Sequence, residues 1–219
     1  MDRPLLARVV PFAVYMVFLA LEQGSRTWIG DGLDVRWLYP VKAVAVSIAL
    51  WHFRSEYREL LLRPGRQSLL VSPLLGIGVF VLWINLDWGW LDLGGSGGYD
   101  PRRPDASLDW ILVAFRLAGA ALVVPLMEEL FWRSFLLRWI ERHEFLSVAA
   151  SEVGLRAILV SSLLFGVEHS LWFAGFLAGL AYAWLYRHYG NLWAPVVAHA
   201  TTNLLLGVWV VQTGAWQFW

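Results

Sequence analysis

The chain has 219 residues, of which 58% are hydrophobic and 16% are charged, whereas a typical soluble domain is ~45–50% apolar and ~25% charged. Its formal net charge is zero and it contains no cysteine. These values give no sign of a nucleic-acid partner, and they exclude disulfides, a cysteine nucleophile and thiolate zinc sites. The mean hydropathy of +0.55 and the 15 tryptophans, a residue that favours the membrane–water interface, predict an all-α integral membrane protein, with residues 1–219 as a single domain in the lipid bilayer.

Apolar stretches recur along the whole chain, and one membrane crossing needs ~20 mostly apolar residues. We predict a bundle of about seven transmembrane helices, with six to eight allowed, at residues 5–22, 37–53, 68–87, 108–140, 156–170, 172–187 and 192–212. The first stretch resembles a signal peptide, but no small-x-small cleavage motif follows it, so a retained span is favoured. The fourth is too long for one straight crossing and is either a tilted helix kinked near Pro125 or two shorter elements. The fifth is short and could be partly re-entrant.

Arginines indicate the orientation of this bundle. They cluster at the N-terminus and in the loops after the second, fourth and sixth predicted spans, which lie on one side of the membrane if the spans alternate. By the positive-inside rule this side is cytoplasmic. We therefore expect a cytoplasmic N-terminus, in a bacterial inner membrane, and we expect the glycine-rich connection 88–107 to be a flexible external loop.

The most informative polar residues interrupt the fourth apolar stretch. Glu128, Glu129 and Arg133 lie there, and an ionisable group within a span costs ~2.5–3.5 kcal/mol on insertion scales, so it indicates function by default. Glu129 and Arg133 share a helical face at i and i+4 and can pair, whereas Glu128 points about 100° away. One carboxylate can then be held ionised while the other faces a cavity. The alternative is a helix end at the membrane interface, with both glutamates in water.

Two further pairs lie in later spans at the same helical spacing. Phe165 and His169 form one pair, and His199 and Asn203 form the other. A single histidine such as His169 is more often a packing residue, and His and Asn commonly bond one membrane helix to another, so each pair alone is ambiguous. With the two glutamates and the arginine, however, they supply a carboxylate base, an imidazole partner and donors for an oxyanion, which are the components of a hydrolytic site.

Three other ionisable residues lie in or beside the spans. We expect Lys42 to snorkel toward the interface, Arg116 to pair with a carboxylate, and Glu168 to turn away toward the interface. Neither Lys42 nor Arg116 is assigned a catalytic role.

These motifs, in this order, resemble the CPBP family, which comprises CAAX prenyl proteases and bacteriocin-processing enzymes and is also called the Abi family of intramembrane glutamic endopeptidases. The family pattern EExxxR, FxxxH and HxxxN is met by residues 128–133, 165–169 and 199–203. The resemblance covers about residues 108–212, and it leaves the role of residues 1–107 open. One departure is Ser134, since many members have glycine after the arginine.

The resemblance implies a role for each residue of the first two motifs. Glu128 would activate the water that attacks the scissile peptide bond, and His169 would share this proton transfer or hold the water. Glu129 and Arg133 would orient the site through their ion pair. The residues alone do not decide which glutamate is the base; the family assigns the first.

The resemblance also implies that His199 and Asn203 stabilise the oxyanion. It implies a membrane-associated protein or peptide as substrate. A prenylated CAAX tail requires a host that makes such tails, and in a bacterium a secreted peptide or the tail of a sorted protein fits better. Some bacterial members accompany exosortase systems, which implies a functional link to protein sorting.

Alternative functions compete with this interpretation. His169, His199 and Glu128 could supply three ligands of a zinc protease, but the HExxH motif is absent, so we expect no cofactor and no bound metal. A Ser-His-Asp hydrolase fits poorly, because Ser161 and Ser162 lack a GxSxG context. A scaffold, immunity or transport protein is the alternative from another class, although transporters more often show paired halves with broken helices.

Overall fold

The computed structural model describes residues 2–28, 34–94 and 98–219, without the side chains of residues 25–28. Seven long helices form in this part of the chain, at the seven predicted apolar stretches. They are α1 (Arg3–Trp28), α2 (Leu38–His52), α3 (Arg66–Trp83), a composite helix (Trp110–Glu141), α7 (Leu155–Val167), α8 (Trp172–Tyr189) and α9 (Trp193–Thr213). The predicted all-α class is confirmed.

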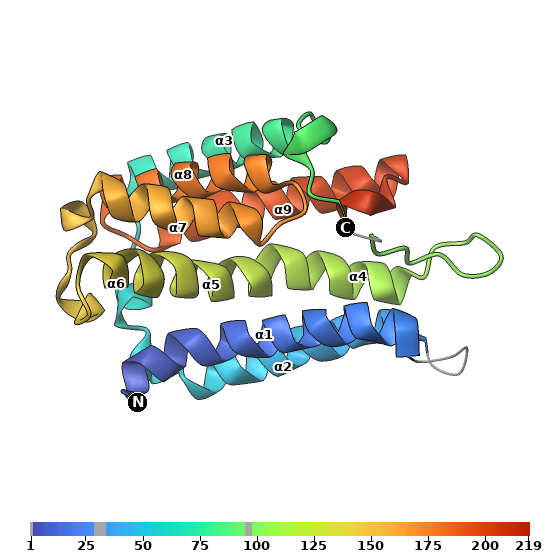
Figure 1. Cartoon of the computed structure of the whole chain (residues 1–219), viewed down its shortest axis with the longest axis horizontal. Helices are drawn as coiled ribbons and strands as arrows, with labels where there is room; N and C mark the ends of the chain where they lie inside the picture. The colour runs from blue at the N-terminus through green and yellow to red at the C-terminus, as the bar shows by residue number, and fades with distance from the viewer. Residues whose placement is uncertain (1, 29–33, 95–97) are drawn as a thin grey trace.

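The composite helix is continuous over 32 residues, so the prediction of two separate elements is wrong. Two π-helical segments interrupt its regular winding. In order, its parts are α4 (Trp110–Ala118), the π segment η5 (Gly119–Val123), α5 (Val124–Glu129), the π segment η6 (Leu130–Leu136) and α6 (Leu137–Glu141). The first π segment ends two residues before Pro125, whose missing N–H disturbs the ladder of the turn before it. Figure 1 shows the parts as one row.

Short 3-10 turns connect the long helices: η1 (Val35–Trp37), η2 (Arg54–Glu56), η3 (Arg58–Leu61), η4 (Gly89–Leu91), η7 (Phe145–Ser147), η8 (Ala150–Glu152) and η9 (Trp216–Phe218). The connection 88–107 contains η4. Its residue Arg102 forms an isolated antiparallel bridge with Leu108. Residues 95–97 of this predicted flexible loop lie outside the described part of the chain.

Apolar side chains cover the outside of the bundle, and charged ones lie within it. Leu70 and Leu122 are 71% and 69% exposed, whereas Lys42, Glu129 and Arg133 are buried. Water would penalise this distribution, whereas a hydrocarbon solvent favours it, because lipid does not penalise exposed apolar side chains and charges must find partners inside. The chain is therefore an integral membrane protein.

The helices differ in how far they reach across the membrane. Within the described residues, 4 helices are long and apolar enough to cross, namely residues 3–24 of α1, α3, the composite helix and α9. Helix α2 has 15 residues and α7 has 13, which gives about 22 Å and about 20 Å at ~1.5 Å per residue. Both are shorter than the ~30 Å hydrocarbon core of a bilayer. Near the C-terminal end of α7, Phe165 and Gly166 are buried in the bundle.

The composite helix runs through the middle of the bundle. The pair α1 and α2 lies on one side of it, and α3, α7, α8 and α9 lie on the other (Figure 1). The arginine-rich N-terminus and the connections 53–65 and 190–192 meet at one end, where Arg3 pairs with Glu56 at 3.0 Å and the Asn191 side chain donates to the Leu62 carbonyl at 2.9 Å. The predicted clustering of arginines at one end is thus observed for the N-terminus and the connection 53–65.

Glycines allow close contact between the helices beyond the composite helix. A Cβ on Gly166 of α7 would lie 2.6 Å from the Trp172 carbonyl oxygen, and one on Gly179 of α8 would lie 2.9 Å from Ser162. Similarly, a Cβ on Gly76 of α3 would clash with the Ala198 carbonyl oxygen of α9. Small residues at such contacts are the usual means of packing membrane helices, since backbones can then approach closely.

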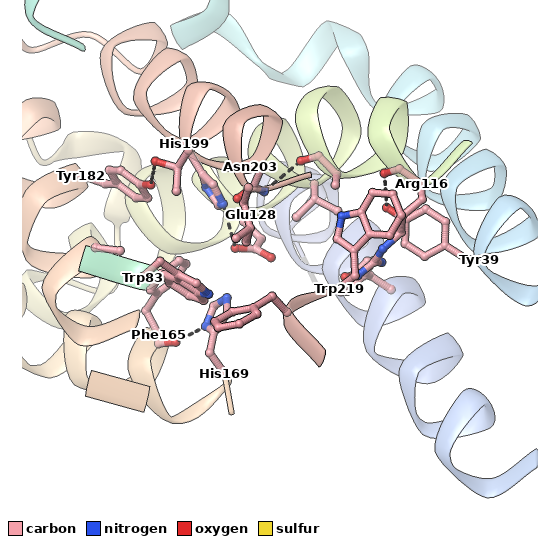
Figure 2. Close-up of a pocket in the computed structure, with 17 residues that line it drawn as sticks. Tyr39, Trp83, Arg116, Glu128, Phe165, His169, Tyr182, His199, Asn203 and Trp219 are labelled. Carbon is pink, nitrogen blue, oxygen red and sulfur yellow. Dashed lines mark hydrogen bonds and ion pairs between the residues drawn. The ribbon is translucent and has the colours of Figure 1, made fainter. Parts of the chain in front are cut away.

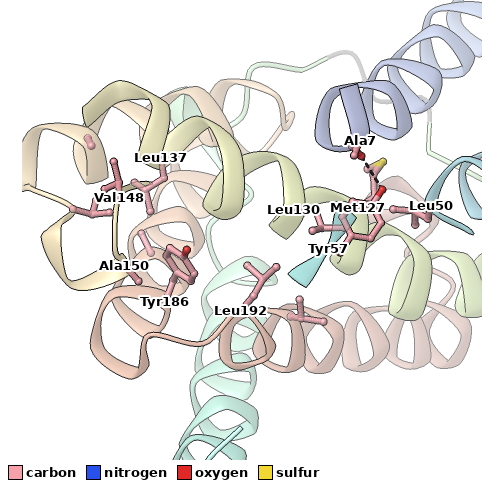
Figure 3. Packing of buried hydrophobic residues seen from close by; sticks show 14 of the residues in the cluster. Ala7, Leu50, Tyr57, Met127, Leu130, Leu137, Val148, Ala150, Tyr186 and Leu192 are labelled. Atoms are coloured by element: carbon pink, nitrogen blue, oxygen red, sulfur yellow. Dashed lines mark hydrogen bonds between the residues drawn. The ribbon is translucent and has the colours of Figure 1, made fainter. Parts of the chain in front are cut away.

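An apolar cluster fills the arginine-rich end of the bundle (Figure 3). It joins side chains from the N-terminal half to those of the composite helix, α8 and α9, and the hydroxyl of Tyr57 donates to the Ala7 carbonyl at 2.7 Å. Its labelled members are Ala7, Leu50, Tyr57, Met127, Leu130, Leu137, Val148, Ala150, Tyr186 and Leu192.

A polar network around Ser134 also joins the two halves of the chain. The Ser134 hydroxyl accepts from Arg8 Nε at 2.7 Å and from Arg138 Nη2 at 2.8 Å, and it donates to Glu59. Glu59 also pairs with Arg8 at 2.5 Å. A glycine at position 134 would remove the hydroxyl that makes these hydrogen bonds. The departure from the family pattern therefore helps to join the two halves of this chain.

Glu59 makes the stability of this network depend on pH. Burial alone would raise the pKa of Glu59, but Arg8 and the Ser134 hydroxyl outweigh it and lower the pKa below its ordinary value of 4.5. A lowered folded-state pKa contributes stability that is present above the unfolded pKa and is lost as pH falls through the folded pKa. We therefore expect the thermal midpoint of the wild type in detergent to fall between about pH 5 and pH 3, with part of this fall due to Glu59.

The substitution Glu59→Gln tests this expectation. It should lower the midpoint near neutral pH, because Arg8 loses its carboxylate, and it should flatten the acid-side fall. The exposed Glu144 provides the matched control, and Glu144→Gln should retain the wild-type profile. An unchanged acid-side fall in Glu59→Gln would contradict the assignment.

Candidate active site

The structure brings together the polar residues that the motifs contribute from four elements (Figure 2). Helix α5 ends at Glu128 and Glu129, and η6 carries Arg133. His169 follows the end of α7, while His199 and Asn203 lie on α9. Long-range packing of the composite helix against α7 and α9 thus unites motifs that are far apart in sequence.

Both glutamates are buried, with exposures of 3% for Glu128 and 0% for Glu129, so the alternative of a solvated helix end is wrong. The predicted Glu129–Arg133 ion pair is present, with 3.1 Å between Oε2 and Nε. Arg133 Nη2 also donates to the Gly179 carbonyl at 3.3 Å, and its guanidinium lies 4.6 Å from the centre of the Phe165 ring. These contacts hold Glu129 in one orientation.

His199 lies between the two carboxylates. Its Nδ1 is 3.0 Å from Glu129 Oε1, and its Nε2 is 3.9 Å from Glu128 Oε2. An ionised carboxylate only accepts hydrogen bonds, so Nδ1 carries a proton toward Glu129. The longer distance exceeds a hydrogen bond, which leaves the Glu128 side of the ring open to another group. Tyr182 stacks on the imidazole at 5.0 Å and 20°.

His169 is oriented by its own helix. Its Nδ1 lies 2.7 Å from the Phe165 carbonyl oxygen, one of the carbonyls that a helix end leaves without an amide partner. A carbonyl only accepts, so Nδ1 is the donor and Nε2 of the neutral ring is the acceptor. The ring also packs edge-to-face on Trp83 at 5.3 Å. The FxxxH spacing therefore fixes the tautomer of this histidine.

Asn203 is oriented by the first π segment. Its Nδ2 donates to the Ala120 carbonyl at 2.9 Å. A π-helical i→i+5 bond would join this carbonyl to residue 125, which is proline and has no N–H. Asn203 supplies the missing donor, as the helix-bonding alternative predicts, and the second hydrogen of its amide group is not needed for that bond.

Glu128 and Glu129 differ in their position relative to a cavity. Glu128, His169, His199 and Asn203 line it, and its volume is about 160 Å³, well above the ~30 Å³ of one water. Glu128 Oε2 is buried and has no hydrogen-bond partner within the described residues. Glu129 does not line the cavity. The site can therefore hold water against one carboxylate while the second carboxylate holds His199.

Two expectations about lone cations in the spans are wrong. Lys42 is buried and pairs with Glu22 at 2.9 Å instead of reaching the interface. Arg116 forms no ion pair with any carboxylate in the described ranges, and its guanidinium lies 4.3 Å from the centre of the Tyr39 ring.

Sequence reasoning also misjudged Glu168 and missed Tyr182. Glu168 is half-buried, and its Oε2 is buried without a hydrogen-bond partner in the part of the chain that the structure describes, so this oxygen does not face the interface as expected. The Tyr182 hydroxyl donates to Thr202 at 2.8 Å while its ring supports His199. A tyrosine among the small residues of α8 is a weak signal, because its partner lies on another helix.

His169, His199 and Glu128 are the candidate ligands for a metal ion. Across residues 2–28, 34–94 and 98–219, no three His, Asp or Glu side chains are grouped closely enough to hold one. The expectation that the protein binds no metal stays a prediction.

The segment that carries the site residues matches a known protein family. Residues 110–205 match the family described as type II CAAX prenyl endopeptidase Rce1-like. This segment of the chain, which is less than half of its length, is therefore similar to the CAAX protease family. The match begins with α4, ends within α9, and includes all six predicted site residues. Searches of curated proteins and of solved structures found no match. At the family level, the match supports a CAAX-type intramembrane protease.

Close packing beside His169 can be tested by adding one methyl group. A Cβ on Gly166 would meet the Trp172 carbonyl at 2.6 Å and the Phe176 backbone nitrogen at 2.9 Å. Because backbone must move to accommodate it, Gly166→Ala should destabilise the protein by about 1–3 kcal/mol. We expect a lower thermal midpoint in detergent and a weakened α7–α8 contact.

Gly78→Ala in α3 is the matched control, since its Cβ would meet nothing within 4 Å. It should leave the midpoint unchanged or raise it slightly, because alanine favours helix more than glycine does. Equal midpoints for the two alanine variants would show that the close contact at Gly166 is not important.

Proposed function

We propose that this protein is a glutamic-type intramembrane endopeptidase that hydrolyses a peptide bond of a membrane-associated protein or peptide. The observation that carries the proposal is the cavity lined by Glu128, His169, His199 and Asn203, in which a buried oxygen of Glu128 has no hydrogen-bond partner among the described residues. The match of residues 110–205 to a protease family supports it.

Glu128 acts as the base in this mechanism. It takes a proton from a water held in the cavity, and the oxygen of that water attacks the scissile carbonyl carbon. His169 helps to hold the water through Nε2, which accepts because Nδ1 is committed to the Phe165 carbonyl. The proton then passes to the nitrogen of the leaving amine, so that one water is consumed for each bond cleaved.

His199 and Asn203 stabilise the negative charge that develops on the carbonyl oxygen. Nε2 of His199 donates when the ring carries two protons, and the contact between Nδ1 and Glu129 compensates that charge. Asn203 contributes the amide hydrogen that Ala120 does not use. Fixed donors of this kind lower the barrier because they need no reorganisation during the reaction.

The surroundings of the site favour a substrate from the membrane. The catalytic groups lie inside an apolar bundle, and α7, which ends two residues before His169, has only 13 residues, a length of about 20 Å. We place the protein in a bacterial inner membrane with the arginine-rich end in the cytoplasm. A secreted peptide or the tail of a sorted protein is the substrate class that we favour.

Purified protein in detergent tests the proposal with a pooled library of synthetic apolar peptides that have free carboxyl ends. Mass spectrometry of the new termini should show cleavage by the wild type. Glu128→Gln, His169→Ala and His199→Ala should each reduce the rate ~10²–10⁴-fold while the helical circular-dichroism spectrum is retained. Cleavage by Glu128→Gln at the wild-type rate would refute the assignment of the base.

Two controls accompany this assay. Glu144→Gln changes an exposed glutamate and should keep full activity. Chelator treatment and metal analysis of the pure protein should leave activity unchanged and find no stoichiometric metal. Activity that is lost with chelator and restored by zinc would favour the metal-dependent alternative.

A further inference from the structure

Arg116 of α4 is a cation within the bundle that the proposed hydrolysis does not use. Its guanidinium lies 4.3 Å from the ring centre of Tyr39 and 6.0 Å from that of Trp219 (Figure 2). The ring centre of Tyr99 lies 5.5 Å from it. Aromatic faces attract a cation but do not replace hydrogen-bond acceptors. Arg116 Nε is buried and has no hydrogen-bond partner within the described residues.

The acidic groups around Arg116 are already engaged with other cations. An outer cavity is lined by Arg116, Lys42, Glu22 and Asp100. Glu22 pairs with Lys42 at 2.9 Å, and Asp100 pairs with Arg102 at 2.5 Å. Arg116 is partly buried, and a charge that is partly removed from water gains from a counterion. The aromatic cage and the buried Nε, which has no hydrogen-bond partner within the described residues, therefore favour an anion that comes from outside the chain.

Arg116 also lines the catalytic cavity together with Glu128. The two residues are twelve positions apart in one continuous helix, which corresponds to about 18 Å at ~1.5 Å per residue. An extended peptide covers this distance with about five residues at ~3.3 Å each. A substrate whose scissile bond lies at Glu128 can therefore place its C-terminal carboxylate at Arg116 if few residues follow the bond.

We propose that Arg116, in its cage of Tyr39, Tyr99 and Trp219, is a subsite that binds the C-terminal carboxylate of the substrate and restricts cleavage to about five residues from the C-terminus. Binding of a carboxylate stands independently, whereas its identification as the substrate terminus rests on the proposed endopeptidase function. A guanidinium suits this task because it is always charged and its N–H groups match the two oxygens of a carboxylate.

A phosphate of a lipid headgroup has related chemistry, but the depth of Arg116 favours a peptide. The residue lies six positions after Trp110, where the composite helix begins, and hence about 9 Å along the helix. A headgroup would have to leave the interface to reach it. A peptide in the catalytic cavity meets Arg116 directly, since both share that cavity.

The test compares an N-acetylated tripeptide of one alanine and two leucines as free acid and as primary amide. Both are titrated into the purified full-length protein in detergent, and binding is followed by intrinsic tryptophan fluorescence, because Trp83 and Trp219 line the cavity and the peptide has no aromatic residue. The acid should bind the wild type at least ~10-fold more tightly than the amide. Arg116→Gln should remove this preference.

Two further variants keep the test interpretable. Arg36→Gln alters another arginine of the outer cavity, one that already pairs with Asp34 at 2.7 Å, and it should retain the preference for the acid. Arg116→Lys keeps the charge without the planar fork and should retain a smaller preference. Equal binding of acid and amide by the wild type, or a preference that survives in Arg116→Gln, would overturn the proposal.

Soluble dihexanoyl phosphatidylglycerol distinguishes the two sources of the anion. It should not displace the acid tripeptide from the wild type. If the lipid binds in an Arg116-dependent manner while the acid has no advantage over the amide, the subsite takes a headgroup and the terminal-carboxylate assignment is wrong.

Cleavage of the peptide library, prepared as free acids and as amides, separates this proposal from the proposed function. Faster cleavage of the acids by the wild type supports both. Equal cleavage of acids and amides overturns the subsite and leaves the endopeptidase function intact. Tighter binding of the acid tripeptide without any cleavage supports the carboxylate site and counts against the endopeptidase.

Discussion

The geometry of the site depends on Glu129, which joins Arg133 of the composite helix to His199 of α9 through its two carboxylate oxygens. A buried ion pair is expensive to form and still more expensive to leave incomplete, so this contact has few alternative arrangements in an apolar interior. Because Glu129 is committed in this way, Glu128 alone is directed into the cavity. Two adjacent and chemically identical residues thereby acquire different environments.

Irregular backbone places the remaining groups around this contact. Helix α7 ends after 13 residues, which leaves the Phe165 carbonyl free to accept from His169 inside the bundle. The π segment before Pro125 similarly leaves the Ala120 carbonyl for Asn203. Unpaired backbone at this depth persists only where protein groups satisfy it, so the helix irregularities and the polar side chains of the site require each other.

Local spacing in the sequence predicted the helices and the Glu129–Arg133 pair, because both depend on residues a few positions apart. It did not predict the contact between Glu129 and His199, the Lys42–Glu22 pair, or the link from Arg8 through Ser134 to Glu59, since each joins separate helices or loops. Whether an intramembrane cation reaches the interface or finds a buried partner is decided by helix packing. The π segments were also missed. Pro125 indicates that the backbone hydrogen bonds of the helix are disturbed, but it does not indicate that a π segment results.

The central claim is that Glu128 activates water for peptide hydrolysis on a membrane substrate. The most direct measurement is a mass-spectrometric survey of protein termini in the native host, comparing the wild type with a chromosomal Glu128→Gln variant at matched expression. We expect that one or a few membrane-associated proteins keep an unprocessed end in the variant. If no terminus changes while deletion of the whole gene still has a phenotype, the claim is contradicted and a non-enzymatic role takes its place.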